Sequence, residues 1–171
     1  MWEKLKKLKF RDIWYKDGLR FECQRCGACC SGAPGIVQFT KEEGLAMAEE
    51  LGIPFEALAE NFAYRHEDIY FLKDFPCEYG YDCVMLQRYE SGAPSGCLVS
   101  RSKPVQCKTW PFWPEILYSK RTWEQAAKKC PGINKGRLYT LEEIQKQMRQ
   151  TPQPDFEPPE EDCHTQKPDI K

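Results

Sequence analysis

Four cysteines lie within eight residues near the start of the chain: Cys23, Cys26, Cys29 and Cys30. They form a C-x2-C-x2-C-C run that contains Gly27. A two-residue spacing lets a tight loop direct successive thiolates at one centre, and glycine leaves room for backbone amides to reach the sulfur atoms. The run predicts a metal-binding loop in which the first three cysteines share one centre.

The chain has 10 cysteines in 171 residues, and their meaning depends on the redox compartment. Residues 1–20 are basic but contain no apolar stretch with a cleavage site, so no signal peptide is predicted. The sequence contains no run of about 18 apolar residues, so no membrane span is predicted. We therefore expect a soluble, cytoplasmic protein, in which thiols do not persist as structural disulfides. Metal ligation is then the leading explanation for the cysteines.

Four further cysteines are widely separated: Cys83, Cys97, Cys107 and Cys130. Together with the run they make eight thiols, enough for two four-thiolate sites of the kind found in [4Fe-4S] clusters and all-cysteine zinc sites. Cys130 is followed by Pro131, as is the remote ligand of bacterial ferredoxins. This favours a first group made of Cys23, Cys26, Cys29 and Cys130.

Cys30 is assigned differently, because adjacent side chains in an extended segment point to opposite sides. By exclusion, the second group is Cys30, Cys83, Cys97 and Cys107, although a single shared site remains an alternative. Cys77 is interpreted either as a small buried apolar residue or as an alternative ligand. Cys163 is excluded because it lies in a segment predicted to be mobile.

Composition divides the chain into a basic lead-in (1–20), a cysteine-cluster domain (21–150) and an acidic, proline-rich tail (151–171). The tail has almost no apolar residues to bury and is predicted to be disordered. The length suits one domain. The expected fold class is α+β: a small irregular single domain with a helical hairpin, short strands and loops that supply the cysteine ligands.

Local patterns locate the elements of this domain. Thr40 and Glu43 have the spacing of a capping box, so a helix should begin at Lys41. Pro54 suits the first turn of a second helix that runs to about Tyr64. The other expected elements are strands at 36–39, 69–72, 84–86 and 98–99, a helix at 123–129, and a helix that follows a second capping box, Thr140 and Glu143, and reaches Arg149.

An aromatic stretch follows Cys107 and contains Trp110, Phe112 and Trp113. It is interpreted first as hydrophobic core, in keeping with the usual burial of aromatic side chains. Such rings beside a cluster would also limit solvent access and shift its reduction potential. Both interpretations can hold together.

The cysteine pattern resembles the CxxCxxCC cysteine-cluster family, also described as YkgJ-like proteins or as a zinc- or iron-chelating domain. The resemblance covers residues 21–136. Its marks are residues 21–30, Asp82-Cys83, Cys97, residues 103–107 leading into Trp110-Pro111-Phe112, and Cys130-Pro131-Gly132. All eight proposed ligands have a match in the family. The resemblance implies a small cytoplasmic bacterial protein that binds zinc or iron.

Three functions are weighed. The preferred one is an iron-sulfur protein, with one or two clusters of the [4Fe-4S] type, that transfers electrons or senses redox state with a protein or redox partner. The alternative is a binding module stabilised by Zn²⁺ and without catalytic activity. The third is a thiol redox enzyme. It would need a reactive C-x-x-C at the start of a helix, which this sequence does not provide. The formal net charge of −1 suggests neither nucleic acid nor membrane as a partner.

Overall fold

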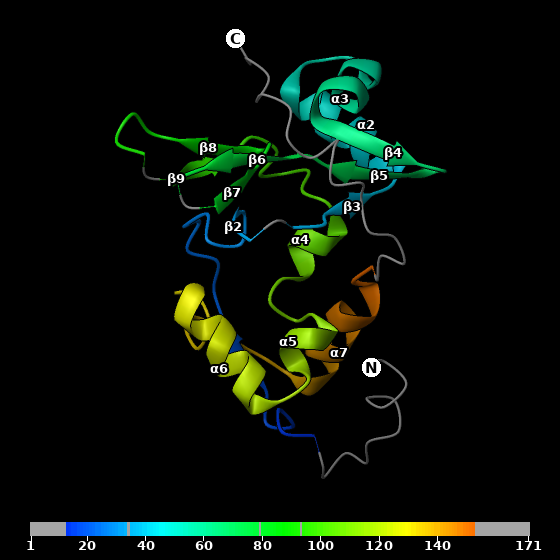
Figure 1. The fold of residues 1–171 in the computed structure, drawn as a ribbon. Coiled ribbons are helices and arrows are strands. Elements are labelled where there is room, and N and C mark those ends of the chain that lie inside the picture. Colours follow the sequence, from blue (N-terminus) through cyan, green and yellow to red (C-terminus); the bar gives the residue numbers. More distant parts are fainter. Residues whose placement is uncertain (1–12, 34, 79, 93, 153–171) are drawn as a thin grey trace. The chain divides into compact units, whose positions relative to one another are not determined.

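The computed structural model describes residues 13–33, 35–78, 80–92 and 94–152. Short helices and small antiparallel sheets alternate along the chain (Figure 1), which confirms the predicted α+β class. Backbone contacts divide the chain into two compact units. Unit 1 comprises Met1–Cys26 and Thr109–Thr151, and unit 2 comprises Gly27–Lys108 and Pro152–Lys171.

The helical hairpin of unit 2 is α2 (Lys41–Leu51) and α3 (Phe55–Phe62). The capping box at Thr40 and Glu43 is present, and Gly52 ends α2 in the left-handed conformation at φ 69°. The capping box and the helix start at Lys41 were predicted. The hairpin lies beside an antiparallel sheet of order β3-β5-β4, whose strands are β3 (Gln38–Phe39), β5 (Ile69–Leu72) and β4 (Ala63–His66).

The rest of unit 2 consists of two hairpin sheets and a short helix. One sheet has the order β2-β7-β6, with strands β2 (Ser31–Gly32), β7 (Gly80–Cys83) and β6 (Asp74–Cys77). The other pairs β8 (Leu86–Arg88) with β9 (Pro94–Cys97), and the helix is α4 (Val105–Thr109). A core that includes Phe39, Met47, Leu58, Val84 and Val99 lies beneath these elements.

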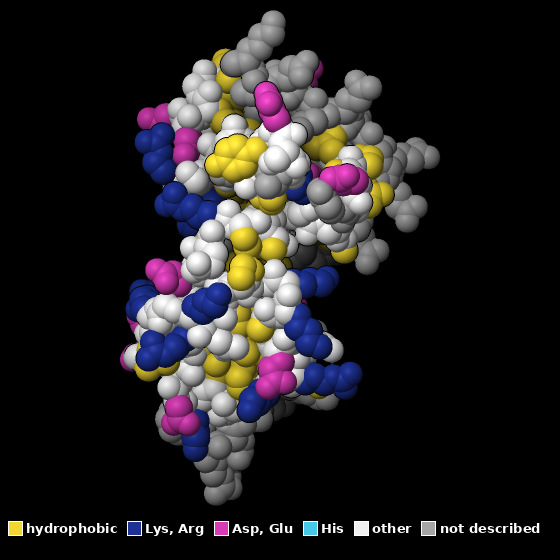
Figure 2. All heavy atoms as spheres, turned by 90° about the vertical axis from the view of Figure 1, so that its left-hand side faces the viewer, with side chains coloured by type: hydrophobic (Ala, Val, Ile, Leu, Met, Phe, Trp, Pro, Cys, Tyr) yellow, Lys and Arg dark blue, Asp and Glu magenta, His cyan; other side chains and the backbone are white. Residues whose placement is uncertain are grey.

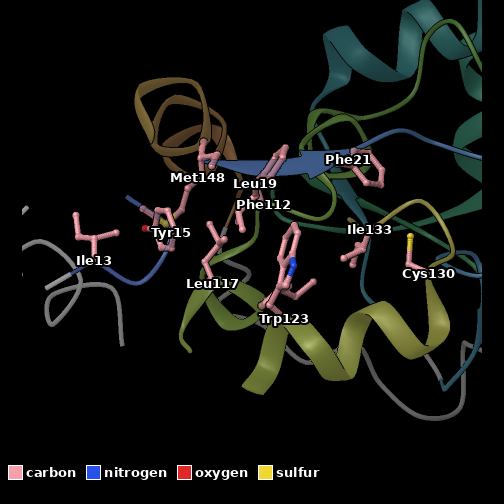
Figure 3. Close-up of a cluster of buried hydrophobic side chains, with 12 residues drawn as sticks. Ile13, Tyr15, Leu19, Phe21, Phe112, Leu117, Trp123, Cys130, Ile133 and Met148 are labelled. Carbon is pink, nitrogen blue, oxygen red and sulfur yellow. The ribbon is translucent and has the colours of Figure 1, made fainter. Parts of the chain in front are cut away.

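Unit 1 is mainly helical. It contains α5 (Pro114–Leu117), α6 (Lys120–Lys129) and α7 (Leu141–Gln150), with a two-stranded sheet of β1 (Leu19–Phe21) and β10 (Arg137–Tyr139). Its core contains Tyr15, Leu19, Phe112, Trp123, Ile133 and Met148 (Figure 3). Phe112 is fully buried, which confirms the core interpretation of that ring.

Several predicted boundaries were wrong. The second helix ends at Phe62, because Tyr64 pairs with Phe71 in the β4–β5 hairpin. Helix α6 begins at Lys120 rather than at residue 123, because Ser119 and Thr122 form a capping box without a Glu or Gln. Thr151, at the predicted start of the tail, is buried and donates to Thr109 Oγ1. Residues 1–12 of the lead-in and 153–171 of the tail lie outside the described residues.

None of the helices in the described part of the chain combines the length and the apolar character that crossing a membrane requires.

Candidate metal centre

The boundary between the two units falls inside the cysteine run, after Cys26. Unit 1 therefore holds Cys23, Cys26 and Cys130. Unit 2 holds the other described cysteines, which are Cys29, Cys30, Cys77, Cys83, Cys97 and Cys107. All nine cysteines in the described part of the chain carry free thiols. Cys163 lies outside the described residues.

In unit 2, the pairing of β2 with β7 brings Cys30 and Cys83 together. Ser31 pairs with Asp82, and one step further along the backbone N–H of Cys83 donates to the carbonyl of Cys30 at 2.8 Å. The two cysteines are 53 residues apart in the sequence. Only the sheet places them side by side.

Cys83 and Cys97 share a local geometry. Each ends a strand, and the sulfur of each accepts a hydrogen bond from the backbone N–H two residues later, that of Met85 and that of Val99. The two turns are themselves joined, because Leu98 N donates to Met85 O at 2.9 Å. Backbone N–H groups that already point at sulfur favour the charged thiolate and help a turn to present it to a metal.

These turns explain two wrong predictions. Residues 84–86 and 98–99 were expected to be strands, but only Leu86 lies in one, at the start of β8, and the chain turns at Val84 and Met85 and again at Leu98 and Val99. Val84, Met85 and Val99 are buried in the core of unit 2. Their apolar character reflects this burial and not a strand.

Cys107 lies on α4. Hydrogen bonds with other parts of unit 2 fix the first turn of this helix. The carboxylate of Glu43 accepts from Val105 N at 2.6 Å as well as from Thr40 N. The buried Gln106 side chain accepts from Gln38 N and donates to Ile36 O. The helix is therefore fastened to α2 and to the segment before β3, and the position of Cys107 is set by contacts remote in sequence.

Cys29 and Cys30 lie in a turn, not in an extended segment as assumed. Cys30 N donates to Gly27 O at 2.8 Å, and the two sulfur atoms are 3.6 Å apart. Gly27 has φ 71°, and a Cβ there would lie 2.6 Å from the side chain of Pro94. Glycine is thus required for both the conformation and the packing. The structure brings Cys29 together with Cys30, so a grouping of Cys29 with unit 2 thiols is an alternative to the one expected from the sequence.

The adjacent thiols of Cys29 and Cys30 favour a state in which one is a thiolate and the other is neutral. The hydrogen bond from Cys30, with the positive charge of Lys103, lowers the pKa of Cys29 to about 7. The same hydrogen bond, burial and the charges of Cys29, Cys83 and Cys107 raise the pKa of Cys30. A second thiolate beside the first is therefore disfavoured.

Three further thiols of unit 2, Cys83, Cys97 and Cys107, have pKa values raised above the ordinary value, which favours their neutral form. Burial raises the pKa of Cys107 to about 12, and the charges of Cys29 and Cys97 add to this shift. Burial also raises the pKa of Cys83 and of Cys97. Each of the five thiols is linked to at least one other, Cys29 through its hydrogen bond with Cys30 and the other four through charge. They are termed the unit 2 thiol cluster (Cys29, Cys30, Cys83, Cys97, Cys107). Only a bound cation would let most of them ionise together.

The chemistry of this donor set suits a metal that prefers sulfur, such as zinc or the iron of an iron-sulfur cluster. In the part of the chain that the structure describes, no three Cys, His, Asp or Glu side chains converge closely enough to hold a metal ion. The thiol cluster therefore fits such a group by its donor types and its location. It does not form a closed coordination shell.

In unit 1, the backbone just before Cys23 pairs with the segment that follows Cys130. Phe21 forms an antiparallel bridge with Ile133, and Glu22 N donates to Gly132 O at 3.1 Å. A Cβ on Gly132 would lie 2.2 Å from Glu22 O, so glycine allows the close backbone approach. Cys23 and Cys26 are exposed, whereas Cys130 is buried.

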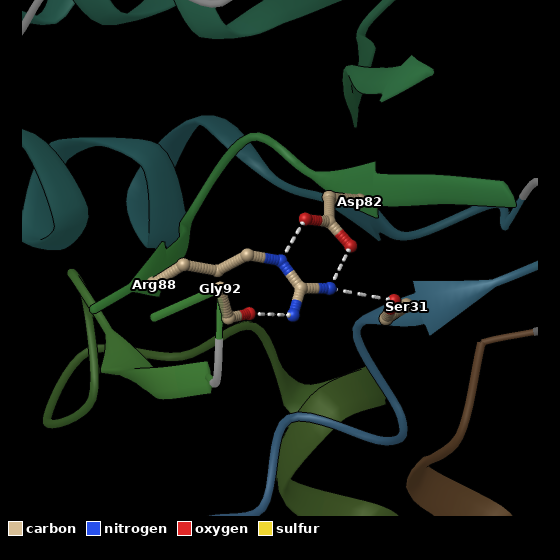
Figure 4. Close-up of polar contacts among 4 residues, drawn as sticks. All are labelled: Ser31, Asp82, Arg88 and Gly92. Atoms are coloured by element: carbon tan, nitrogen blue, oxygen red, sulfur yellow. Dashed lines mark hydrogen bonds and ion pairs between the residues drawn. The ribbon is translucent and has the colours of Figure 1, made fainter. Parts of the chain in front are cut away.

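An arginine that the sequence did not single out connects the strands of the unit 2 thiol cluster (Figure 4). Arg88 donates to both carboxylate oxygens of Asp82, at 2.5 and 2.6 Å, and to Ser31 Oγ and Gly92 O. Ser31 directly follows Cys30, and Asp82 directly precedes Cys83. Arg88 itself lies on β8, which pairs with β9, the strand that ends at Cys97. These bonds hold the pKa of Asp82 below its ordinary value.

Cys77 belongs to this network and not to the thiol cluster. It lies at the end of β6, and its thiol hydrogen-bonds the carboxylate of Asp82. This contact gives Cys77 a structural role of its own.

We predict that Arg88→Met lowers the free energy of unfolding by about 2–3 kcal/mol, because a largely buried carboxylate loses its charged partner. It should also weaken metal binding about tenfold, as the loss of groups that orient ligands does. Titration of the metal-free protein with Co²⁺, followed by its thiolate charge-transfer absorption, measures the second effect. Arg101→Met is the matched control, since it removes an exposed arginine from its ion pair with Glu50 in the same unit, and Glu50 keeps its hydrogen bonds with Ser102. Equal Co²⁺ affinity of both variants would refute the prediction.

Charge is distributed unevenly between the units. Over the described residues, unit 1 has eleven Lys and Arg and six Asp and Glu, whereas unit 2 has seven and twelve. The formal net charges are thus +5 and −5. Lys and Arg side chains gather on the surface of the unit that carries α6 (Figure 2). Helix α6 itself contains Lys120, Arg121, Lys128 and Lys129. The overall charge of −1 conceals this separation.

Comparison with known proteins identifies a relative but no function. The chain is 29% identical over 120 residues to an uncharacterized protein of Methanocaldococcus jannaschii. The aligned region covers 70% of this chain and 58% of the relative, so the chain spans less than two thirds of that protein. No family model matches the chain, and no solved structure matches it.

Proposed function

We propose that this chain is a metal-binding cysteine-cluster protein whose unit 2 thiol cluster carries an iron-sulfur group with an electron-transfer or redox-sensing role. The observation that supports this most is the gathering of five thiols from four separate parts of unit 2. When bound, an iron-sulfur cluster supplies one-electron transfer. Four of the five thiols, Cys30, Cys83, Cys97 and Cys107, are the group expected from the sequence.

The residues of unit 2 divide the work of holding such a group. Met85 and Val99 donate backbone N–H groups to two of the sulfurs. The positive charge of Lys103 acts on Cys29, Cys97 and Cys107, and so offsets part of the charge of their thiolates. Arg88 holds the strands in register. The compartment we propose is the reducing cytoplasm, in which thiols do not persist as structural disulfides.

Structural zinc is the second candidate. The strands around the thiol cluster are only two to four residues long, and such strands contribute little stability on their own. Zinc bound to four thiolates supplies folding energy directly, without a redox reaction. The protein would then be a binding module.

Metal and acid-labile sulfide analysis of protein purified without oxygen separates the two candidates. Iron with sulfide and a broad absorption band near about 400 nm supports the iron-sulfur proposal. Zinc without sulfide or colour rejects it in favour of the zinc module. Absence of both metals after anaerobic purification and reconstitution would reject metal binding altogether.

A further inference from the structure

Helix α6 of unit 1 presents a basic face to solvent. An α-helix turns by about 100° per residue, so Arg121 and Lys128 lie on the side opposite the buried Trp123. Glu124 is the one acidic residue of the helix. The exposed basic residues, termed the α6 basic face, are Lys120, Arg121, Lys128 and Lys129.

These charges are not neutralised within unit 1. The ion pairs between described residues involve Arg65, Arg88, Arg101 and Arg137, and therefore none of the four residues of the α6 basic face. Unit 1 carries a formal net charge of +5 over its described residues. Residues 1–12 precede them in the sequence and add five Lys and Arg against two acidic residues. The argument against a nucleic acid partner rested on the total charge of −1, which averages unit 1 with unit 2.

The segment after α6 adds further positive charge beside the helix. Trp123 Nε1 donates to Asn134 Oδ1 at 2.9 Å, and Asn134 N donates to Arg20 O at 2.9 Å. The guanidinium of Arg20 in turn donates to Gly136 O at 2.7 Å. Arg20 and Lys135 are both exposed and are held next to α6 by these bonds.

An exposed aromatic ring adjoins the start of the α6 basic face. Tyr118 directly precedes Ser119, the N-cap of α6, and 52% of its surface is exposed. Proteins that bind single-stranded nucleic acids combine positive charges, which follow the phosphates, with aromatic rings on which bases stack. Unit 1 brings both kinds of group together at one helix.

The composition of this face favours nucleic acid over a membrane or a protein. A helix that lies in a membrane surface needs large apolar side chains on its outer side, whereas α6 turns Trp123 into the core. Protein interfaces have an apolar centre and are depleted in lysine. Three of the four residues of the α6 basic face are lysines, as expected of the strongly positive interfaces that proteins form with nucleic acids.

We propose that unit 1 binds single-stranded RNA, with the α6 basic face on the phosphates and Tyr118 stacked on a base. Arg121 and Lys128 are seven residues apart, which is about 10 Å along the helix and close to three nucleotide steps of about 3.4 Å. RNA is favoured over DNA because proteins recognise RNA mostly through unpaired bases that stack on aromatic side chains. Since phosphate contacts do not read sequence, the binding is sequence-independent. This inference does not depend on the metal of unit 2.

The test is fluorescence anisotropy of a dye-labelled, mixed-sequence single-stranded RNA of about 20 nucleotides. Full-length protein purified without oxygen is titrated into it over a range of salt concentrations. The first variant is Arg121→Gln, Lys128→Gln. Its matched control is Lys41→Gln, Arg101→Gln, which removes two exposed positive charges from unit 2. Tyr118→Ala tests stacking separately.

At about 0.1 M salt, Arg121→Gln, Lys128→Gln should weaken RNA binding about 25-fold, because each phosphate contact in a single strand contributes about fivefold. The slope of log affinity against log salt should become shallower by about 1.4. Tyr118→Ala should weaken binding about tenfold and leave the slope unchanged. The control double variant should bind as the wild type does.

Absence of wild-type binding at low salt, or an equal loss in the control double variant, would overturn the proposal. Unchanged binding by Tyr118→Ala would overturn the stacking role and with it the preference for single strands. Tighter binding of single-stranded DNA of the same sequence would overturn the choice of RNA. Equal affinity for polyglutamate with the same number of charges would instead assign the α6 basic face to an acidic protein partner.

Discussion

Replacing Cys83 and Cys107 together by serine should remove the metal of unit 2 and with it the ordered structure around β2 and β7. Two substitutions are needed because the thiol cluster has five members, so a single loss leaves four potential ligands. Structural thiolate sites contribute on the order of 10 kcal/mol to folding at neutral pH. This is comparable with the whole stability of a small domain.

Metal analysis should show the loss of one centre per chain, and hydrogen exchange followed by mass spectrometry should show rapid exchange in Gly80–Cys83. The matched control is the double variant Cys77→Ser, Cys163→Ser, which removes two cysteines placed outside the ligand set. Cys77 contacts Asp82, and a serine hydroxyl can replace that hydrogen bond. Equal metal content in the two double variants would contradict the assignment.

Phe112→Ala should lower the free energy of unfolding of unit 1 by about 3–5 kcal/mol, the usual cost of removing a buried aromatic ring. Phe112 is fully buried, and its ring centroid lies 4.8 Å from that of Tyr139 and 6.1 Å from those of Phe21 and Trp123. The cavity would thus open between β1, α6 and β10, which carry these three neighbouring rings.

Tryptophan fluorescence during urea unfolding measures this effect on unit 1 alone, because residues 27–108 contain no tryptophan. Tyr118→Ala is the control, since Tyr118 lies in the same unit with 52% of its surface exposed and should cost less than about 0.5 kcal/mol. A loss below about 1 kcal/mol for Phe112→Ala would show that the ring does not support this core.

Local signals predicted the helices best. The capping boxes at Thr40 and Thr140 involve neighbours three residues away, so sequence alone contains the whole interaction. The start of α6 was missed because Thr122 takes the place of the expected Glu or Gln. Strands were wrongly predicted at residues 84–85 and 98–99, because the apolar composition of these turns reflects burial, which is a tertiary property.

The candidate site was predictable in its residue types but not in its arrangement. Counting cysteines and excluding those of the ferredoxin-like group selected Cys30, Cys83, Cys97 and Cys107, all of which lie in unit 2, and their sharing of one centre stays a prediction. Cys29 joins them because a turn at Gly27, not an extended segment, precedes it. Arg88 had no signal in the sequence, since its partners come from three separate segments.

X-ray absorption at the edge of the metal that the purified protein retains tests the central claim most directly. The proposed thiolate centre predicts a coordination shell made of sulfur at about 2.3 Å, the distance typical of metal–thiolate bonds in proteins. For an iron-sulfur group, a second shell of iron should appear beyond it. A shell made only of oxygen or nitrogen would contradict the claim, because it would mean that the gathered cysteines do not bind the metal.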